Sequence, residues 1–133
     1  MTYTGSIEDR VAIRELLETY NDAVFRRDQE AWTSTWAEDA EWVLLGNSIT
    51  GRDNIVQAWL GAMGTFSYVG FFASPGSIVV SGDTAQTRVY VRETLIETSG
   101  NKRNLEGLYE DTCIRADGKW LFSRRNYQIL QEL

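Results

Sequence analysis

Apolar residues recur at three- and four-residue spacings over the first part of the chain. This spacing lines up one face of a helix of about twenty residues. Ser6 stands in the N-cap position before it, and Glu8 and Asp9 favour its first turn. The apolar face consists of Ile13, Leu16, Leu17, Tyr20 and Val24.

The segment that follows predicts a short helix, a short strand and a third helix. Asp28 is suited to cap the second helix, and Asp53 opens the third. Residues 41–45 between them predict a strand, after which glycines at 46 and 51 leave room for a short hairpin. The second helix should carry Ala31, Trp32 and Trp36, and the third Ile55, Val56, Trp59, Leu60 and Met63.

The second half of the chain changes to aromatic and β-branched residues separated by turn signals. Three turns, at residues 81–83, 99–101 and 117–118, predict hairpins that join long strands. The predicted strands are residues 66–80, 84–98, 102–115 and 119–130. Pro75 should bend the first of them, because proline is tolerated in strands mainly at edges and bulges. Helices followed by a run of strands define an α+β fold.

Composition narrows the classes of function. The 133 residues suit one domain, 1–133, and the net charge of −6 without a basic run disfavours nucleic acid as a partner. No apolar stretch approaches the roughly 20 residues that span a bilayer, and no signal peptide is visible, so we expect no membrane association and a cytoplasmic protein. The single cysteine, Cys113, is expected to be a small buried hydrophobe.

The chain contains no histidine. This chain by itself therefore supplies no imidazole that could act as a base, an acid or a metal ligand. With only one cysteine as well, we expect no metal site. We also expect no cofactor.

The order of these elements and five local motifs resemble the SnoaL-like family of the nuclear-transport-factor-2-like superfamily. Within it, the pattern is closest to hexachlorocyclohexane dehydrochlorinase and scytalone dehydratase. The motifs are residues 13–20, 36–42, Gly51, 82–85 and 117–125, and together they cover nearly the whole chain. The resemblance implies a cone-shaped curved antiparallel sheet packed with three N-terminal helices, an apolar pocket at its wide end, and homodimers through the outer sheet face.

The resemblance also shows what is missing. Dehydrochlorinase-like members pair an aspartate near the end of the first helix with a histidine on the first long strand. The matching positions here are Phe25 and Phe72. The proton-abstracting dyad is therefore absent, and these rings, with Phe71 and Trp42, would favour an aromatic or polycyclic ligand.

Other positions of the family pattern persist. Trp42 matches a pocket tryptophan, and Asp111 and Arg125 match an acid and an arginine on adjacent strands. Further residues match positions that face the pocket in such relatives: Tyr20, Tyr90, Arg92, Tyr109 and Tyr127.

Strand alternation does not decide which faces point inward. Tyr109 and Asp111 share one face of their strand, as do Leu121, Ser123, Arg125 and Tyr127 on the next. Tyr90, Arg92 and Thr94 lie opposite Val89 and Val91. Either the polar faces line the pocket or they are solvated and the valines line it.

Each candidate residue has a catalytic and a structural interpretation. Asp111 could act as the acid or base, or could tie two strands together through Arg125. Arg92 and Arg125 could bind an oxyanion or pair with acids across strands. Tyr109 and the other tyrosines could donate hydrogen bonds to a substrate oxygen or pack in the core.

Two hypotheses follow. In the first, the chain is a cofactor-independent lyase, isomerase or cyclase that acts on an apolar cyclic substrate with Asp111, Arg125 and Tyr109. In the second, it is a non-catalytic ligand-binding or dimeric interaction module. Fold alone does not separate them, because one fold hosts many functions.

Overall fold

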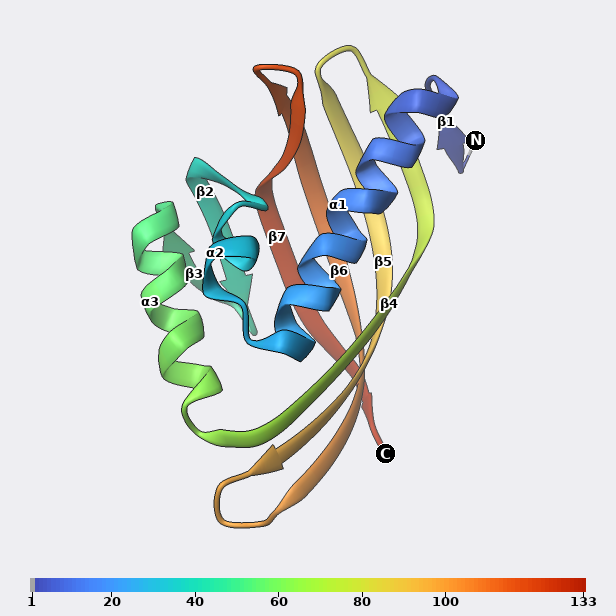
Figure 1. The fold of residues 1–133 in the computed structure, drawn as a ribbon. Helices are drawn as coiled ribbons and strands as arrows, with labels where there is room; N and C mark the ends of the chain where they lie inside the picture. The colour runs from blue at the N-terminus through green and yellow to red at the C-terminus, as the bar shows by residue number, and fades with distance from the viewer. Residues whose placement is uncertain (1) are drawn as a thin grey trace.

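Seven strands form one strongly curved sheet, and three helices pack on its concave side in the computed structural model, which describes residues 2–133 (Figure 1). The helices are α1 (Ile7–Arg26), α2 (Gln29–Thr33) and α3 (Arg52–Met63). The strands are β1 (Tyr3–Thr4), β2 (Trp36–Leu44), β3 (Asn47–Thr50), β4 (Phe66–Ser81), β5 (Thr84–Glu97), β6 (Lys102–Ala116) and β7 (Lys119–Glu132). The predicted α+β class is confirmed.

The sheet has the order β1-β4-β5-β6-β7-β2-β3. The four long strands from β4 to β7 are joined by hairpins and pair antiparallel, as predicted. Two pairings are parallel, β1 with β4 and β2 with β7, and neither was predicted from the sequence. The pairing of β2 with β7 brings the first half of the chain against the last strand, and this closes one side of the cavity described below.

The three predicted helices are present, but two apolar residues expected on them are misplaced. Leu60, expected on the apolar face of the third helix, is 36% exposed on α3. Ser6 caps α1 by accepting from the Asp9 amide at 3.0 Å, and Asp28 caps α2 by accepting from the Ala31 amide at 3.0 Å. Trp36 does not belong to the second helix, because that helix ends at Thr33 and Trp36 begins β2. The predicted strand at residues 41–45 is thus the second part of a longer strand.

Irregular pairing bends the long strands. The register of β4 against β5 shifts between Pro75 and Ser77, where proline removes a backbone donor. The register of β7 against β6 shifts at Ser123, which is an extra residue opposite Thr112 and Cys113. Bulges of this kind increase twist and curvature, and here they give the sheet its cone shape.

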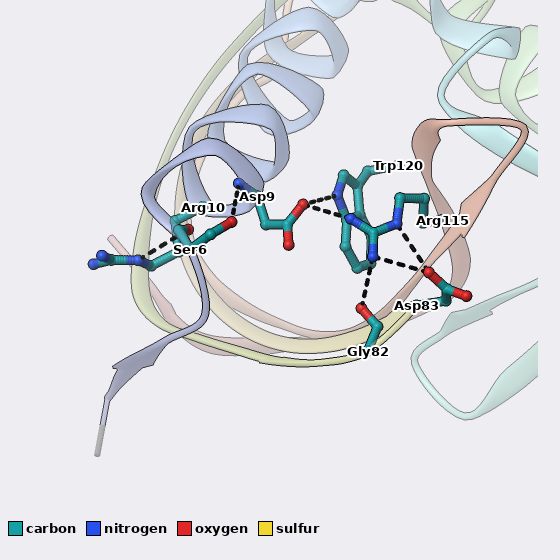
Figure 2. A network of polar contacts seen from close by, with 7 residues as sticks. All are labelled: Ser6, Asp9, Arg10, Gly82, Asp83, Arg115 and Trp120. Atoms are coloured by element: carbon teal, nitrogen blue, oxygen red, sulfur yellow. Dashed lines mark hydrogen bonds and ion pairs between the residues drawn. The ribbon is translucent and has the colours of Figure 1, made fainter.

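A polar network fastens the first turn of α1 to two hairpins of the sheet (Figure 2). The Oδ1 atom of Asp9 accepts from Arg115 Nη1 at 2.7 Å and from Trp120 Nε1 at 3.2 Å. Arg115 Nε in turn donates to Asp83 Oδ1 at 2.9 Å in the β4–β5 turn. The amide of Asp9 is also the one that Ser6 caps, so helix capping and sheet contact meet at one residue.

Candidate functional site

A cavity of about 290 Å³ lies between the concave face of the sheet and the C-terminal halves of α1 and α3. Most of its wall is apolar, contributed by both helices and by strands β2 and β4 to β7. The apolar lining consists of Val24, Leu44, Leu45, Trp59, Ala62, Met63, Phe66, Val69, Phe71, Leu95, Leu105 and Ile129. Such a wall suits a largely apolar small molecule held by a few polar groups.

One carboxylate lies in this apolar wall. Glu93 projects from β5, and its Oε2 accepts a hydrogen bond from the Tyr127 hydroxyl of β7 at 2.7 Å. Within residues 2–133 no other hydrogen bond or ion pair to this carboxylate is found. Oε1 therefore has no fixed donor and is free to contact a bound molecule.

Burial perturbs the acidity of this pair. Desolvation raises the pKa of Glu93, whereas the hydrogen bond from Tyr127 and the positive charge of Arg103 oppose the rise. Burial also raises the pKa of the Tyr127 phenol, and the neighbouring Glu93 carboxylate adds to this shift. A raised pKa brings the protonated and ionised forms of the carboxyl group closer in free energy at neutral pH, which is the direction that acid–base catalysis favours.

A second hydroxyl lies on the cavity wall beside this pair. Tyr109 of β6 accepts a hydrogen bond from Trp42 Nε1 of β2 at 3.2 Å, and its ring lies 4.7 Å from that of Tyr127. The Trp42 bond occupies an acceptor site of the phenol, so the phenol proton can be donated, either to the neighbouring Tyr20 oxygen or to a bound molecule. Burial raises the pKa of Tyr109, so this proton stays on the oxygen.

Asp111 and Arg125 are not part of the cavity wall. Both are buried behind it, where Asp111 accepts two hydrogen bonds from Arg125, at 2.9 and 3.1 Å, and a third from the Thr87 hydroxyl at 3.1 Å. Burial raises the pKa of Asp111, and the Arg125 charge opposes the rise. Both oxygens of this carboxylate are therefore engaged. This geometry supports the interpretation in which Asp111 ties two strands together through Arg125.

Aromatic rings enclose the Arg125 guanidinium. Its central carbon lies 3.8 Å from the ring centre of Tyr109, 4.2 Å from that of Phe122 and 4.5 Å from that of Tyr20. The negative faces of such rings stabilise a desolvated cation. Tyr20 and Tyr109 also line the cavity, so they form a floor with the ligand space on one side and the ion pair on the other.

Three predicted pocket residues lie on the opposite face of the sheet. Tyr90 and Arg92 point outward from β5, and Arg92 pairs there with Glu106 of β6. Phe72 is 70% exposed on the neighbouring β4. The expectation that these residues line the cavity is wrong. On β5 the side chains that face inward are those of Val91, Glu93 and Leu95, and the side chains that alternate with them face outward.

Phe25 also lies outside the cavity. Its ring, 38% exposed, packs edge-on against Phe72 at 5.1 Å. The inward ring on this part of β4 belongs to the preceding residue, Phe71, which lines the cavity and lies 5.6 Å from Tyr20. The two phenylalanines that occupy the family's dyad positions therefore meet each other without filling the cavity.

Four predicted pocket residues do line the cavity. They are Tyr20, Trp42, Tyr109 and Tyr127. Their positions on α1, β2, β6 and β7 bring together segments from the whole chain. The predicted common face of Leu121, Ser123, Arg125 and Tyr127 is interrupted by the bulge at Ser123, and Phe122 faces inward in place of Leu121 and Ser123.

The sequence reasoning missed two charged cavity residues, Glu93 and Arg103. A signal for Glu93 existed: it is the one charged residue in the alternating set Val89, Val91, Glu93 and Leu95. A charge in a buried apolar stripe deserves a functional explanation. Arg103 had no comparable signal, because it lies near a turn where exposed arginines are ordinary.

The remaining groups offer fewer options for chemistry. Cys113 is fully buried, as expected, and burial raises the pKa of its thiol, which disfavours a thiolate. Among residues 2–133 no group of three or more carboxylate or thiol side chains is arranged to hold a metal ion. Within the same range, no helix is long and apolar enough to cross a membrane.

A cone-shaped α+β scaffold with an apolar cavity and a few inward polar groups defines the class of this protein. A family model described as "SnoaL-like domain" matches residues 5–126, and the chain belongs to this family. An uncharacterized protein of Mycobacterium tuberculosis, Rv2910c, is 29% identical over 130 residues, covering 94% of this chain and 88% of the relative.

Solved structures show the same fold. A Novosphingobium aromaticivorans protein provisionally assigned as a scytalone dehydratase has a TM-score of 0.87 at 24% identity, covering 96% of this chain and 87% of that one. A hexachlorocyclohexane dehydrochlorinase of Novosphingobium barchaimii, LinA-type3, has a TM-score of 0.83 at 21% identity, covering 96% and 90%. At these identities the likeness extends to the fold alone, and the resemblance to this subgroup is confirmed at that level.

Proposed function

We propose that this protein is a cofactor-independent lyase, isomerase or cyclase that transfers a proton on an apolar cyclic substrate, with Glu93 as the acid or base. The observation that carries the proposal is a single carboxylate in an apolar cavity, bonded through one oxygen to Tyr127. This assignment replaces the sequence-based candidate Asp111, whose two oxygens are both committed to other residues.

The environment of Glu93 suits proton transfer. Desolvation raises its pKa, so that its protonated and ionised forms lie closer in free energy at neutral pH than those of an exposed glutamate. Tyr127 fixes the orientation of one oxygen, which leaves the other for the substrate. A positioned acid or base of this kind contributes roughly a hundredfold to ten-thousandfold in rate.

Tyr109 is the proposed donor to negative charge that develops on the substrate. Its hydroxyl accepts from Trp42, and the Arg125 cation lies against the face of its ring at 3.8 Å. The positive charge stabilises the phenolate form, which opposes the rise in the pKa of Tyr109, makes its proton more acidic and so strengthens the hydrogen bond that the hydroxyl donates. Arg125 would act through Tyr109 as a positioning residue and not by contact with the substrate.

The family supports this reaction class. Members of this fold are often cofactor-free isomerases and dehydratases. Isomerisation, elimination and many cyclisations share a first step in which a base removes a proton next to a carbonyl group. A carboxylate and a hydroxyl donor on one cavity wall are the two groups that this step needs.

Hydrogen exchange tests the proposal without knowledge of the natural substrate. Cyclic ketones such as 1-tetralone, incubated in D₂O, lose their α-protons wherever a base removes them, and NMR reports the rate. We expect exchange above the buffer rate with the unaltered protein and a loss of about a hundredfold or more in Glu93→Gln. Glu106→Gln on the outer face is the matched control and should retain the rate. If Glu93→Gln exchanges as fast as the unaltered protein, Glu93 is not the base.

A non-catalytic module is the second candidate, and the outer face of the sheet supports it. Phe72 and Tyr90 are 70% and 47% exposed there, beside the Arg92–Glu106 pair. Apolar rings flanked by charges of both signs suit a self-complementary contact, and we propose a homodimer through this face. Tyr90→Glu should convert a dimer to a monomer in light scattering. A monomer at all concentrations in the unaltered protein would rule the dimer out.

A further inference from the structure

We propose that the ligand of the cavity is an apolar cyclic molecule that carries a carboxylate, and that Arg103 binds this group in exchange for Glu132. The inference rests on the proposed function only in using the same cavity. It concerns how the ligand is held at the opening, and its test measures binding and not proton transfer.

Arg103 lies where the cavity meets solvent. Its side chain lines the cavity and is also 37% exposed, so it spans the wall and the opening. The other lining residues on this side, including Leu105 and Ile129, are apolar. Arg103 is therefore the positively charged group that an entering molecule contacts at the opening, beside an otherwise apolar wall.

Glu132 already occupies the guanidinium in the way that a ligand carboxylate would. Its two oxygens accept from Nε and Nη2 of Arg103 at 3.1 and 2.9 Å. This two-point geometry is the strongest arrangement between the two groups, and a planar guanidinium selects a planar carboxylate. Glu132 is 49% exposed, so its release into water needs no rearrangement of the core.

The exchange makes charge the basis of selection. A ligand carboxylate that replaces Glu132 leaves the number of charged hydrogen bonds to Arg103 unchanged, and the released glutamate regains water. A neutral ligand gains nothing from Arg103 and relies on apolar contact alone. A carboxylate on the Arg103 side would also place the far end of a ring system toward Glu93 and Tyr127 on the same wall.

Two probes of the same shape test the inference, 2-naphthoate and its neutral counterpart 2-naphthamide. Binding is followed by NMR through the indole signals of Trp42 and Trp59, which line the cavity. We expect the unaltered protein to favour naphthoate. Glu132→Gln should tighten naphthoate by about tenfold, because it frees Arg103, and should leave naphthamide within about twofold. Arg103→Gln should weaken naphthoate by about tenfold and leave naphthamide unchanged.

An exposed arginine–glutamate pair of the same sheet provides the control. Glu106→Gln breaks the Arg92 pair on the outer face and should change neither affinity. Equal binding of the two probes, or an equal effect of Arg103→Gln on both, would overturn the carboxylate inference and leave the Glu93 proposal standing. If Glu93→Gln loses ketone exchange but the protein shows no preference for naphthoate, only the Glu93 proposal is supported. If naphthoate is preferred but Glu93→Gln keeps ketone exchange, only the carboxylate inference is supported. If neither probe binds, the carboxylate inference is wrong, and ketone exchange alone decides the Glu93 proposal.

Discussion

The buried Asp111–Arg125 pair should be a major source of stability, and Asp111→Asn tests this directly. The substitution keeps the shape of the side chain and removes its charge. Arg125 would then remain in its aromatic enclosure, 1% exposed, without the carboxylate that accepts its hydrogen bonds at 2.9 and 3.1 Å. Breaking a buried pair by removing one partner costs about 3–5 kcal/mol, because the other charge stays buried.

That loss is large against the stability of an ordinary domain, about 5–15 kcal/mol. With a urea dependence of about 1–3 kcal/mol per molar, the midpoint of unfolding should fall by roughly 2 M. Glu106→Gln breaks an exposed pair of the same kind, for which a change of about 0–1 kcal/mol is expected. The two variants differ mainly in the burial of the broken pair.

Urea unfolding followed by tryptophan fluorescence measures both variants, and the double variant Asp111→Leu, Arg125→Met completes the comparison. Replacing both charges with apolar groups should cost less than Asp111→Asn alone, because no unpaired charge is left. If Asp111→Asn costs no more than Glu106→Gln, the buried pair does not hold the sheet together. The structural role given to Asp111 would then have to be abandoned.

Three further predictions concern other parts of the molecule. Burial raises the pKa of Glu93 in the folded state above the unfolded value of about 4.3. Ionised Glu93 therefore destabilises the fold at pH values above the folded-state pKa, and this cost is absent below the unfolded pKa, where the side chain is protonated in both states. Glu93→Gln should therefore raise the free energy of unfolding at about pH 8, and this gain should vanish by about pH 4 in urea titrations. Gly107→Ala would drive a Cβ into the Tyr127 ring and should cost about 1–3 kcal/mol in thermal unfolding, whereas Gly61→Ala, in open space on α3, should stabilise by about 0.5–1 kcal/mol. Arg115→Met should cost about 1 kcal/mol and speed amide exchange in the first turn of α1; unchanged exchange there would contradict the network in Figure 2.

Local patterns predicted the long elements well. The four predicted strands agree with β4 to β7 within a few residues, because turn residues at 81–83, 99–101 and 117–118 mark each reversal. Ser6 and Asp28 located two helix starts through capping, which depends on nearest neighbours. Trp36 was misplaced because a tryptophan four residues after Trp32 fits a helix and a strand equally well.

The cavity was harder to predict, because it depends on which strand face turns inward. The polar set Tyr90 and Arg92 looked as chemically suitable as Tyr109 and Tyr127, yet curvature buries one set and exposes the other. Period-two alternation relates residues within a strand and does not orient the strand relative to the helices. The one informative exception was Glu93, a charge among inward valines.

Asp111 and Arg125 show a second limit. The sequence placed them on adjacent strands, and the structure pairs them directly across β6 and β7. Whether a buried acid faces a ligand or is enclosed depends on the third layer, here the rings of Tyr20 and Tyr109. Those rings come from α1 and β6, so no local window of sequence contains the answer.

The bulge at Ser123 has a consequence for how this strand can change in evolution. Phe122 and Arg125 both face inward although three positions separate them, because Ser123 is the extra residue between them. Deleting Ser123 would restore regular alternation and leave both side chains on the inner side. The strand would lose its bend and keep its core residues. Curvature, and with it the width of the cone, is therefore encoded separately from the identity of the core, so a lineage could reshape the enclosed volume by gaining or losing one residue.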